Sequence, residues 1–158
     1  MGMVPGTVPF SHTIPAMTAT DGTLILLPVD GSETSLRAAE YCVWFARATG
    51  GRVLALNVQP AFENWQTHGI GHDVAIKHRQ ELARTSCEKA LEVLAGTPHE
   101  FLEAEGEPAE TIGRIAQERK CTHVVMGTRG LGKVSGVLMG SVAMKTFHLV
   151  SVPITFIR

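Results

Sequence analysis

Five short strand-like segments alternate along this chain with segments of helical periodicity, and no other feature limits its fold as much. Four are continuous apolar runs that suit strands buried on both faces, and one alternates polar and apolar residues like a half-exposed strand. The pattern predicts an α/β fold: an open five-stranded parallel sheet with helices on both faces. The five segments are Leu24–Val29, Val53–Val58, Glu100–Glu105, Thr122–Met126 and Val152–Ile157.

The segments between the strands carry signals of helix ends. Ser32 is a residue type preferred at helix N-caps, Gly50 suits a helix end, and Pro108 is tolerated in a first turn. Because Pro153 cannot donate to a ladder, the last strand is expected at an edge or an interface. Apolar residues at helical spacing predict the buried faces of three helices: Leu36, Ala39, Val43 and Ala46 in the first, Ala83, Cys87, Ala90, Leu91 and Leu94 in the second, and Ile112, Ile115 and Ala116 in the third. A last helix is expected over Val142–Phe147.

Length and composition favour one domain. Residues 1–21 are rich in Pro, Thr and Gly and lack the basic and apolar regions of a signal peptide, so we expect a flexible leader before a folded domain over 22–158. The formal net charge of −1 favours neither a nucleic-acid partner nor a membrane surface. Cys42, Cys87 and Cys121 lie among apolar residues, which predicts buried reduced thiols and a cytoplasmic protein.

A glycine-rich segment follows the fourth predicted strand and precedes the last predicted helix. It runs from Gly127 through Lys133 and continues to Gly140 and Ser141. This arrangement suits a phosphate, because glycines allow close backbone approach and positive φ angles. The backbone N–H groups and the helix N-terminus add partial positive charge. The segment therefore predicts a bound nucleotide.

Two common nucleotide-binding motifs do not fit this segment. A Walker A loop requires a hydroxyl residue directly after its lysine, and here Val134 follows Lys133. The dinucleotide fingerprint G-x-G-x-x-G would start at Gly130, but position 135 is Ser135 rather than glycine. Neither a P-loop nor a dinucleotide site is predicted.

One spacing does hold: G-x2-G-x9-G-S/T, formed by Gly127, Gly130, Gly140 and Ser141. On this motif the sequence resembles the nucleotide-binding branch of the universal stress protein family. The resemblance covers Thr23–Arg158. It extends to the segments Pro28–Ser32, Gly106–Ala109, Val125–Gly130 and Val152–Ile154.

The resemblance implies a Rossmann-like sheet in the strand order 3-2-1-4-5, which makes the first and fourth strands neighbours. It further implies ATP as the ligand, with Mg²⁺ or Mn²⁺, and a homodimer built through the last strand over 152–157. The nucleotide site that it implies consists of Pro28, Val29, Asp30, Val58, Met126, Gly127, Thr128, Arg129, Gly130, Gly132, Lys133, Gly140, Ser141 and Val142.

The side chains of this site have distinct expected roles. Arg129 and Lys133 are suited to charge-assisted hydrogen bonds with phosphate oxygens, and Ser141 to capping a helix. The resemblance implies that Ser141 and the N–H after it also face the phosphates. It places Asp30 near the ribose or a nucleotide-bound cation, and the main chain of Val58 beside the adenine.

The expected function is that of an ATP-binding regulator in the stress response. The alternative is a slow ATPase or phosphotransferase using the same site. No general base stands out beside the glycine segment, so at most weak hydrolysis is expected. A metal site among His68, His72, Asp73 and His78 is disfavoured, and His123 and His148 are expected to be structural. The variants Gly127→Ala and Gly140→Ala are expected to remain folded and lose nucleotide.

Overall fold

The computed structural model describes residues 22–59, 81, 84–85, 87–131 and 138–158. Five strands form one sheet in the order β3-β2-β1-β4-β5, and every neighbouring pair is parallel. The predicted α/β fold, its strand order and the edge position of the last strand are confirmed. The strands are β1 (Leu24–Pro28), β2 (Arg52–Gln59), β3 (His99–Glu105), β4 (His123–Gly127) and β5 (Ile154–Ile157).

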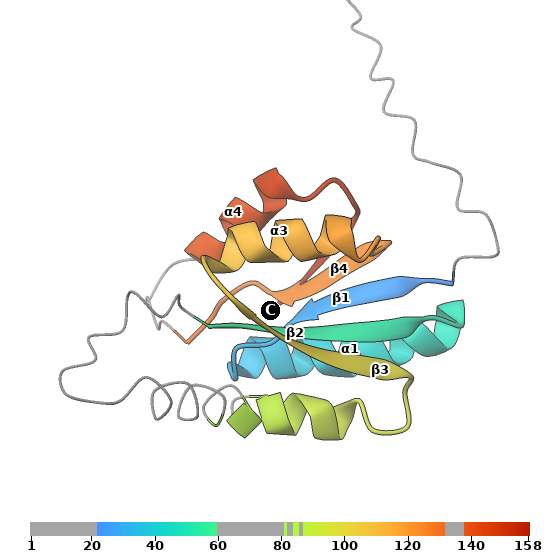
Figure 1. Ribbon diagram of the computed structural model, residues 1–158. Helices are drawn as coiled ribbons and strands as arrows, with labels where there is room; N and C mark the ends of the chain where they lie inside the picture. Colours follow the sequence, from blue (N-terminus) through green and yellow to red (C-terminus); the bar gives the residue numbers. More distant parts are fainter. Residues whose placement is uncertain (1–21, 60–80, 82–83, 86, 132–137) are drawn as a thin grey trace, which may run out of the picture.

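Helices cover both faces of this sheet (Figure 1). The helix α1 (Glu33–Thr49) and a helical stretch over 87–93 lie on one face. The helices α3 (Pro108–Glu118) and α4 (Ser141–Leu149) lie on the other face. No helix in the described part of the chain is both long and apolar enough to cross a membrane.

The core consists of two apolar clusters, one on each face of the sheet. Alternate residues of β1 divide between them: Ile25 and Leu27 face α1, whereas Leu24 and Leu26 face α3 and α4. This division explains why the first strand is a continuous apolar run, since both of its faces are covered.

The three cysteines lie in this core, as predicted, and all three are free thiols. Burial raises the pKa of Cys42 to about 12 and the pKa values of Cys87 and Cys121 to about 11. Their thiols are therefore protonated near neutral pH, and they pack as small apolar side chains.

The helix ends follow the predicted signals in three cases and differ in one. Ser32 caps α1 by accepting a hydrogen bond from Ser35 N, and Gly50 ends that helix in the left-handed conformation at φ +64°. Pro108 occupies the first turn of α3. The helix α4 begins at Ser141, so its N-cap is Gly140 and Ser141 does not cap it.

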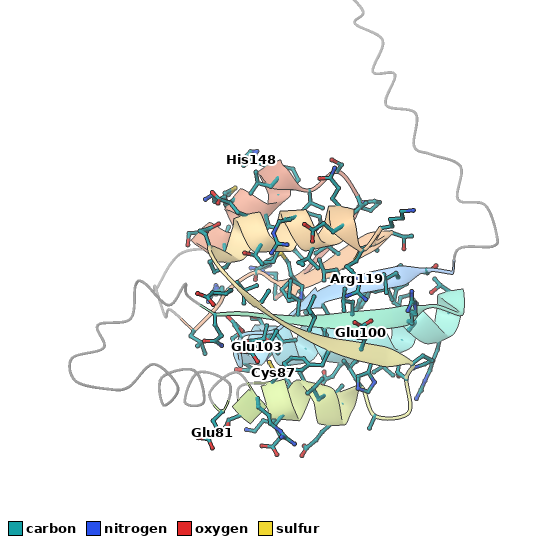
Figure 2. The ribbon with its side chains drawn as sticks, in the orientation of Figure 1. Glu81, Cys87, Glu100, Glu103, Arg119 and His148 are labelled. Carbon is teal, nitrogen blue, oxygen red and sulfur yellow. The ribbon has the colours of Figure 1, made fainter. Side chains whose placement is uncertain are left out.

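The two edges of the sheet differ in chemistry. The edge strand β3 carries three glutamates, and Glu100 accepts a hydrogen bond from Arg119 Nη2, just beyond the end of α3, at 2.6 Å (Figure 2). The opposite edge strand β5 has the sequence Ile-Thr-Phe-Ile. Pro153 lies just before β5, and its carbonyl oxygen accepts from Val124 N at 2.9 Å.

Candidate functional site

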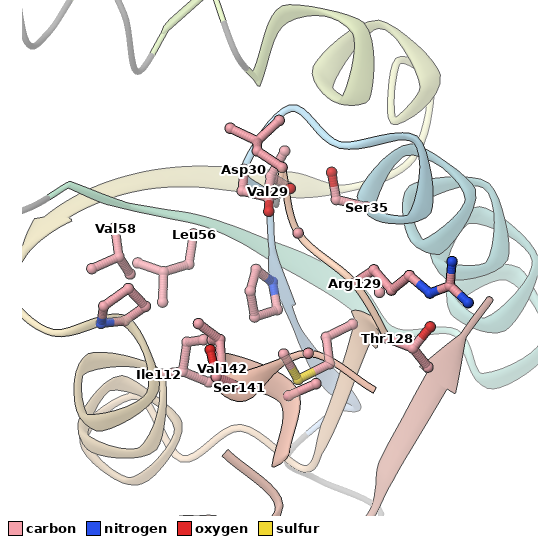
Figure 3. Close-up of a pocket in the computed structure, with 18 residues that line it drawn as sticks. Val29, Asp30, Ser35, Leu56, Val58, Ile112, Thr128, Arg129, Ser141 and Val142 are labelled. Atoms are coloured by element: carbon pink, nitrogen blue, oxygen red, sulfur yellow. The ribbon is translucent and has the colours of Figure 1, made fainter. Parts of the chain in front are cut away.

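A pocket of about 460 Å³ opens where β1 and β4 end (Figure 3). The chain leaves β1 for α1 on one face and leaves β4 toward α4 on the other, so the loops diverge and a crevice remains between them. The predicted site residues of β1, β2, β4 and α4 all line this pocket, while Gly132 and Lys133 lie outside the described residues. The lining is Pro28, Val29, Asp30, Ser35, Leu56, Val58, Pro108, Ile112, Met126, Gly127, Thr128, Arg129, Gly130, Leu131, Gly140, Ser141, Val142 and Ala143.

One end of the pocket is apolar. Leu56 and Val58 approach from β2, and Pro108 and Ile112 approach from the first turns of α3. Figure 3 shows Val58 and Leu56 side by side at this end, opposite Ile112 and Val142. A flat aromatic base fits such a surface, because small-molecule pockets bury most of their ligand against apolar side chains.

The opposite end is formed by the glycine segment, which is held against the start of α1. Thr34 Oγ1 donates to Arg129 O at 2.5 Å, and Ser32 Oγ donates to the same oxygen at 3.4 Å. Gly140 N donates to Thr128 O at 2.6 Å. The last bond joins the two halves of the glycine motif directly.

Gly127 and Gly130 of the motif serve close approach, and none of its three glycines adopts an unusual backbone angle. Gly127, Gly130 and Gly140 are not among the described glycines with positive φ, so that expectation was wrong for these three. A Cβ on Gly127 would lie 2.8 Å from Thr34 Cβ and 2.9 Å from the main-chain carbon of Thr34. A Cβ on Gly130 would lie 2.7 Å from Asp30 Oδ2.

The N-terminus of α4 opens into the pocket without a side-chain cap. Gly140 is its N-cap and makes no side-chain hydrogen bond, and Met144 N is the first amide to bond within the helix, to Gly140 O at 3.0 Å. The preceding amides of Ser141, Val142 and Ala143 therefore have no partner within the helix. They provide hydrogen-bond donors and the positive end of the helix dipole to an anion in the pocket.

Two charged side chains belong to the described part of the pocket lining. Asp30 Oδ1 accepts from Ser32 N at 2.9 Å, which fixes the carboxylate beside the turn after β1. Arg129 is exposed, and Figure 3 shows its guanidinium directed away from the apolar end. It is the main chain of Arg129, held by Thr34, that shapes the glycine end of the pocket.

Six lining residues were missed from the sequence: Ser35, Leu56, Pro108, Ile112, Leu131 and Ala143. One of them, Leu56, carried a usable signal. Leu56 lies two residues before Val58, so both side chains share one face of β2. Pro108 and Ile112 are four residues apart and share one side of α3. No local sequence signal indicated that this side of α3 lies over the pocket.

The described residues contain no group of three His, Cys, Asp or Glu side chains that could hold a metal ion. Asp30 is the one carboxylate in the described lining. A single carboxylate fits a divalent cation that takes most of its ligands from nucleotide phosphates and water. His68, His72, Asp73 and His78 lie outside the described residues.

The two histidines expected to be structural do not line the pocket. His123 Nε2 lies 2.9 Å from Thr155 Oγ1, and its ring meets the edge of Phe45 at a centroid distance of 4.8 Å. His148 is exposed on α4 beside the ring of Phe147, at 5.4 Å.

Comparison with known proteins adds an independent finding. Residues 23–158 match the model of the universal stress protein family. A universal stress protein of Thermus aquaticus, described by its position 3' of a QAH/OAS sulfhydrylase, is 34% identical over 135 residues, which cover 85% of this chain and 97% of that relative. The solved structure of universal stress protein UspA from Lactobacillus plantarum matches with a TM-score of 0.74 at 22% identity, over 86% of this chain and 97% of that one.

Two other similar structures are described as nucleotide complexes. One is a universal stress protein in complex with cAMP, at TM-score 0.63 and 20% identity over 87% of this chain and 97% of that one. The other is the universal stress protein from Archaeoglobus fulgidus in complex with dAMP, at TM-score 0.62 and 18% identity over 87% of this chain and 98% of that one. At these identities the likeness shows a shared fold.

Proposed function

Because the chain belongs to the universal stress protein family, we propose that it is an ATP-binding regulator in the stress response. One observation carries the proposal: the uncapped N-terminus of α4 opens into the pocket and is joined to the glycine segment by the Gly140–Thr128 hydrogen bond. This arrangement presents several N–H donors to one anionic group. ATP binding would then change the contacts that the protein makes with itself or with partners.

The pocket also suits the other parts of a nucleotide. In the proposed pose the base lies against Leu56, Val58 and Ile112, and the main chain of Val58 contacts its edge. The ribose or a phosphate-bound Mg²⁺ or Mn²⁺ lies near Asp30, and the phosphates lie between Gly130 and Ser141. The complexes of two relatives with cAMP and dAMP support an adenine nucleotide.

The lining supports a binding protein rather than a catalyst. Among its described residues, the charged side chains are Asp30 and Arg129, and none is a histidine, lysine, cysteine or tyrosine. Phosphoryl transfer usually needs a group that orients the attacking nucleophile. Asp30 already accepts the hydrogen bond of Ser32 N. We therefore propose that this site acts through nucleotide binding rather than through nucleotide hydrolysis.

The proposal includes a homodimer and a cytoplasmic location. The edge strand β5 is apolar and only half-buried, as expected of a strand that pairs with a second copy. The three buried free thiols are typical of a reducing compartment.

Binding is tested directly with protein stripped of nucleotide. Calorimetric titration with ATP in the presence of Mg²⁺ or Mn²⁺ should give saturable binding at a dissociation constant in the micromolar range. Mass spectrometry of small molecules released from gently purified protein should identify an adenine nucleotide. The absence of binding with both cations would disprove the proposal.

The variant Ser141→Asp isolates the contribution of the helix terminus. An aspartate in the first turn of α4 favours the helix through its dipole, with a stabilisation of roughly 0.3–1 kcal/mol, but repels phosphate. We expect ATP affinity to fall by at least about tenfold, the equivalent of about 1.4 kcal/mol, with no loss of thermal stability. The control Ser141→Asn has the same shape without the charge and should bind within about threefold of the wild type. Equal affinity in both variants would exclude phosphate from this position.

A further inference from the structure

Val29, the first residue after β1, leaves the hydrogen-bond ladder between β1 and β2 half-complete. Val29 N donates to Leu56 O at 2.8 Å. In a parallel ladder the Val29 carbonyl would then accept from Val58 N–H. Asn57 Nδ2 donates to that carbonyl instead, at 2.7 Å, and no bond from Val58 N–H to Val29 O forms.

The main chain of Val58 faces the pocket as a result. Leu56 O bonds toward β1, whereas Gln59 O accepts from Gly106 N beyond the end of β3. Successive residues of a strand direct their N–H and C=O groups to opposite sides, so those of Val58 point the same way as those of Leu56. The β1–β2 register ends at Pro28 opposite Leu56, so β1 supplies no partner at Val58. Among the described residues, no backbone hydrogen bond occupies that side of Val58.

The amide of Asn57 is held firmly in this role. Asn57 is 2% exposed, and its Oδ1 accepts a hydrogen bond from Gln59 Nε2 at 2.5 Å. The Val29 carbonyl can only accept, so the NH₂ group of Asn57 must face it, and Oδ1 is then left for Gln59. Cys87 Sγ lies 3.9 Å from the same carbonyl as a weak second donor.

We propose that Asn57 is a positioning residue that makes this pocket selective for adenine. By taking the Val29 carbonyl, its side chain keeps the N–H of Val58 out of the ladder. The C=O of Val58 lies beyond the end of the β1–β2 register, so both groups are left facing the base. Adenine presents the acceptor N1 beside the donor N6 amino group, which matches one N–H and one C=O. Hypoxanthine presents a donor and an acceptor in the reverse order. The inference rests on the proposed nucleotide site and adds the side chain that makes it selective.

The first test needs no nucleotide. In the variant Asn57→Leu the side chain has no donor, so the Val29 carbonyl should pair with Val58 N–H and complete the ladder. Hydrogen exchange of the Val58 amide, followed by NMR in nucleotide-free protein, should be at least about tenfold slower in the variant than in the wild type. Equal exchange rates would overturn the inference.

The second test compares three ligands: ATP, ITP and inorganic tripolyphosphate. Wild-type protein should bind ATP at least about tenfold more tightly than ITP, as expected for hydrogen bonds together worth about 1.4 kcal/mol. In Asn57→Leu this ratio should fall below about threefold while the affinity for tripolyphosphate stays unchanged. Equal weakening of all three ligands would show a merely structural role and overturn the inference.

The outcomes separate the inference from the proposed function. If wild-type protein binds neither ATP nor ITP, the proposed function fails and the selectivity fails with it. If ATP binds but its preference over ITP survives in Asn57→Leu, the inference alone is wrong.

A second variant covers the case in which Asn57→Leu does not fold. In Gln59→Glu, the carboxylate cannot donate to Asn57 Oδ1, so the amide of Asn57 is no longer fixed. Gln59 is only half-buried, and this variant keeps its size. We expect the same changes in Val58 exchange and in the ATP-to-ITP ratio, with smaller amplitude. Gln59→Glu protein that matches the wild type in both measurements would overturn the inference.

Discussion

The missing side chain of Gly127 lets the end of β4 pass directly against the start of α1. The structure assigns this glycine to packing, because its Cβ would meet both the side chain and the main chain of Thr34. Gly140 differs, since its nearest contact would be Thr128 O at 3.4 Å and its φ of −72° suits any residue. Packing therefore explains why position 127 is a glycine, but it does not explain why position 140 is one.

This difference separates two variants that the sequence alone predicts to behave alike. Gly127→Ala forces a methyl group against the main chain at Thr34, and overpacking of this kind typically costs about 1–3 kcal/mol. We expect a clear loss of unfolding free energy in urea denaturation. Gly140→Ala should remain within about 0.5 kcal/mol of the wild type and lose ATP affinity. Equal stability of the two variants would contradict the packing assigned to Gly127.

His123 links stability to pH. Desolvation by burial lowers the pKa of its imidazole below the ordinary value of 6.5. The unfolded chain therefore takes up a proton at higher pH than the folded one, so this contribution to stability is present above about pH 6.5 and is lost as the pH falls through the folded pKa. Denaturation between pH 7.5 and 5 should show this loss in the wild type and a smaller one in His123→Gln. The exposed His148→Gln serves as the control and should behave like the wild type.

At the scale of elements, the two edge strands explain where a second copy would add. The edge strand β3 carries Glu100, Glu103 and Glu105, and charged edge residues oppose pairing with another strand. The other edge strand, β5, carries no charge. The carbonyl groups of Pro153 and Ile157 bond to β4 and its following residue, so the main-chain groups of Ile154 and Phe156 face outward.

The outward N–H of Phe156 gives a sharp test of pairing through β5. Phe156→Pro removes this donor without removing a hydrogen bond to β4, and Phe156→Ala removes the same ring but keeps the donor. If the homodimer forms through β5, light scattering should show a dimer that dissociates at least about tenfold more readily in Phe156→Pro than in Phe156→Ala. Equal dissociation of the two variants would contradict main-chain pairing at this edge.

The helices also differ in how their N-terminal ends are capped. Side chains cap α1 and α3, through Ser32 and Glu107, whereas α4 has no side-chain cap. Lys145 of α4 bridges to the first turn of α3, with Nζ at 3.0 Å from Glu110 Oε1 and 3.3 Å from Glu107 Oε2. These exposed ion pairs hold together the two helices whose first turns line the pocket, with a small contribution to stability.

For the whole molecule, the site depends on strand order. The residues around Asp30 and those around Gly130 are a hundred positions apart, and they meet because β1 and β4 are neighbours in the sheet. The helices then leave on opposite faces of the sheet (Figure 1). The pocket lies between the loops that lead to them. The glycine segment becomes part of this pocket only because β1 and β4 are neighbours.

The sequence by itself determined the strands and the α/β class, and its resemblance to a known family indicated most of the candidate site. Apolar runs, capping residues such as Ser32 and the G-x2-G-x9-G-S spacing act locally, so they can be recognised without coordinates. It placed the inner face of α1 imperfectly, because Leu36 and Val43 are only half-buried while Ala38 and Cys42 are fully buried. Periodicity gives a helix its apolar stripe, but the neighbour it packs on sets which side of that stripe is deepest.

Only the tertiary structure decided which contacts the site residues make. It assigned Gly127 to packing, turned the side chain of Arg129 away from the apolar end, and added Pro108 and Ile112 from a helix that follows β3. It also gave the carbonyl of Val29 to the side chain of Asn57. The physical reason is common to all of these: each depends on the distance between atoms far apart in the chain, which local propensity and spacing do not encode.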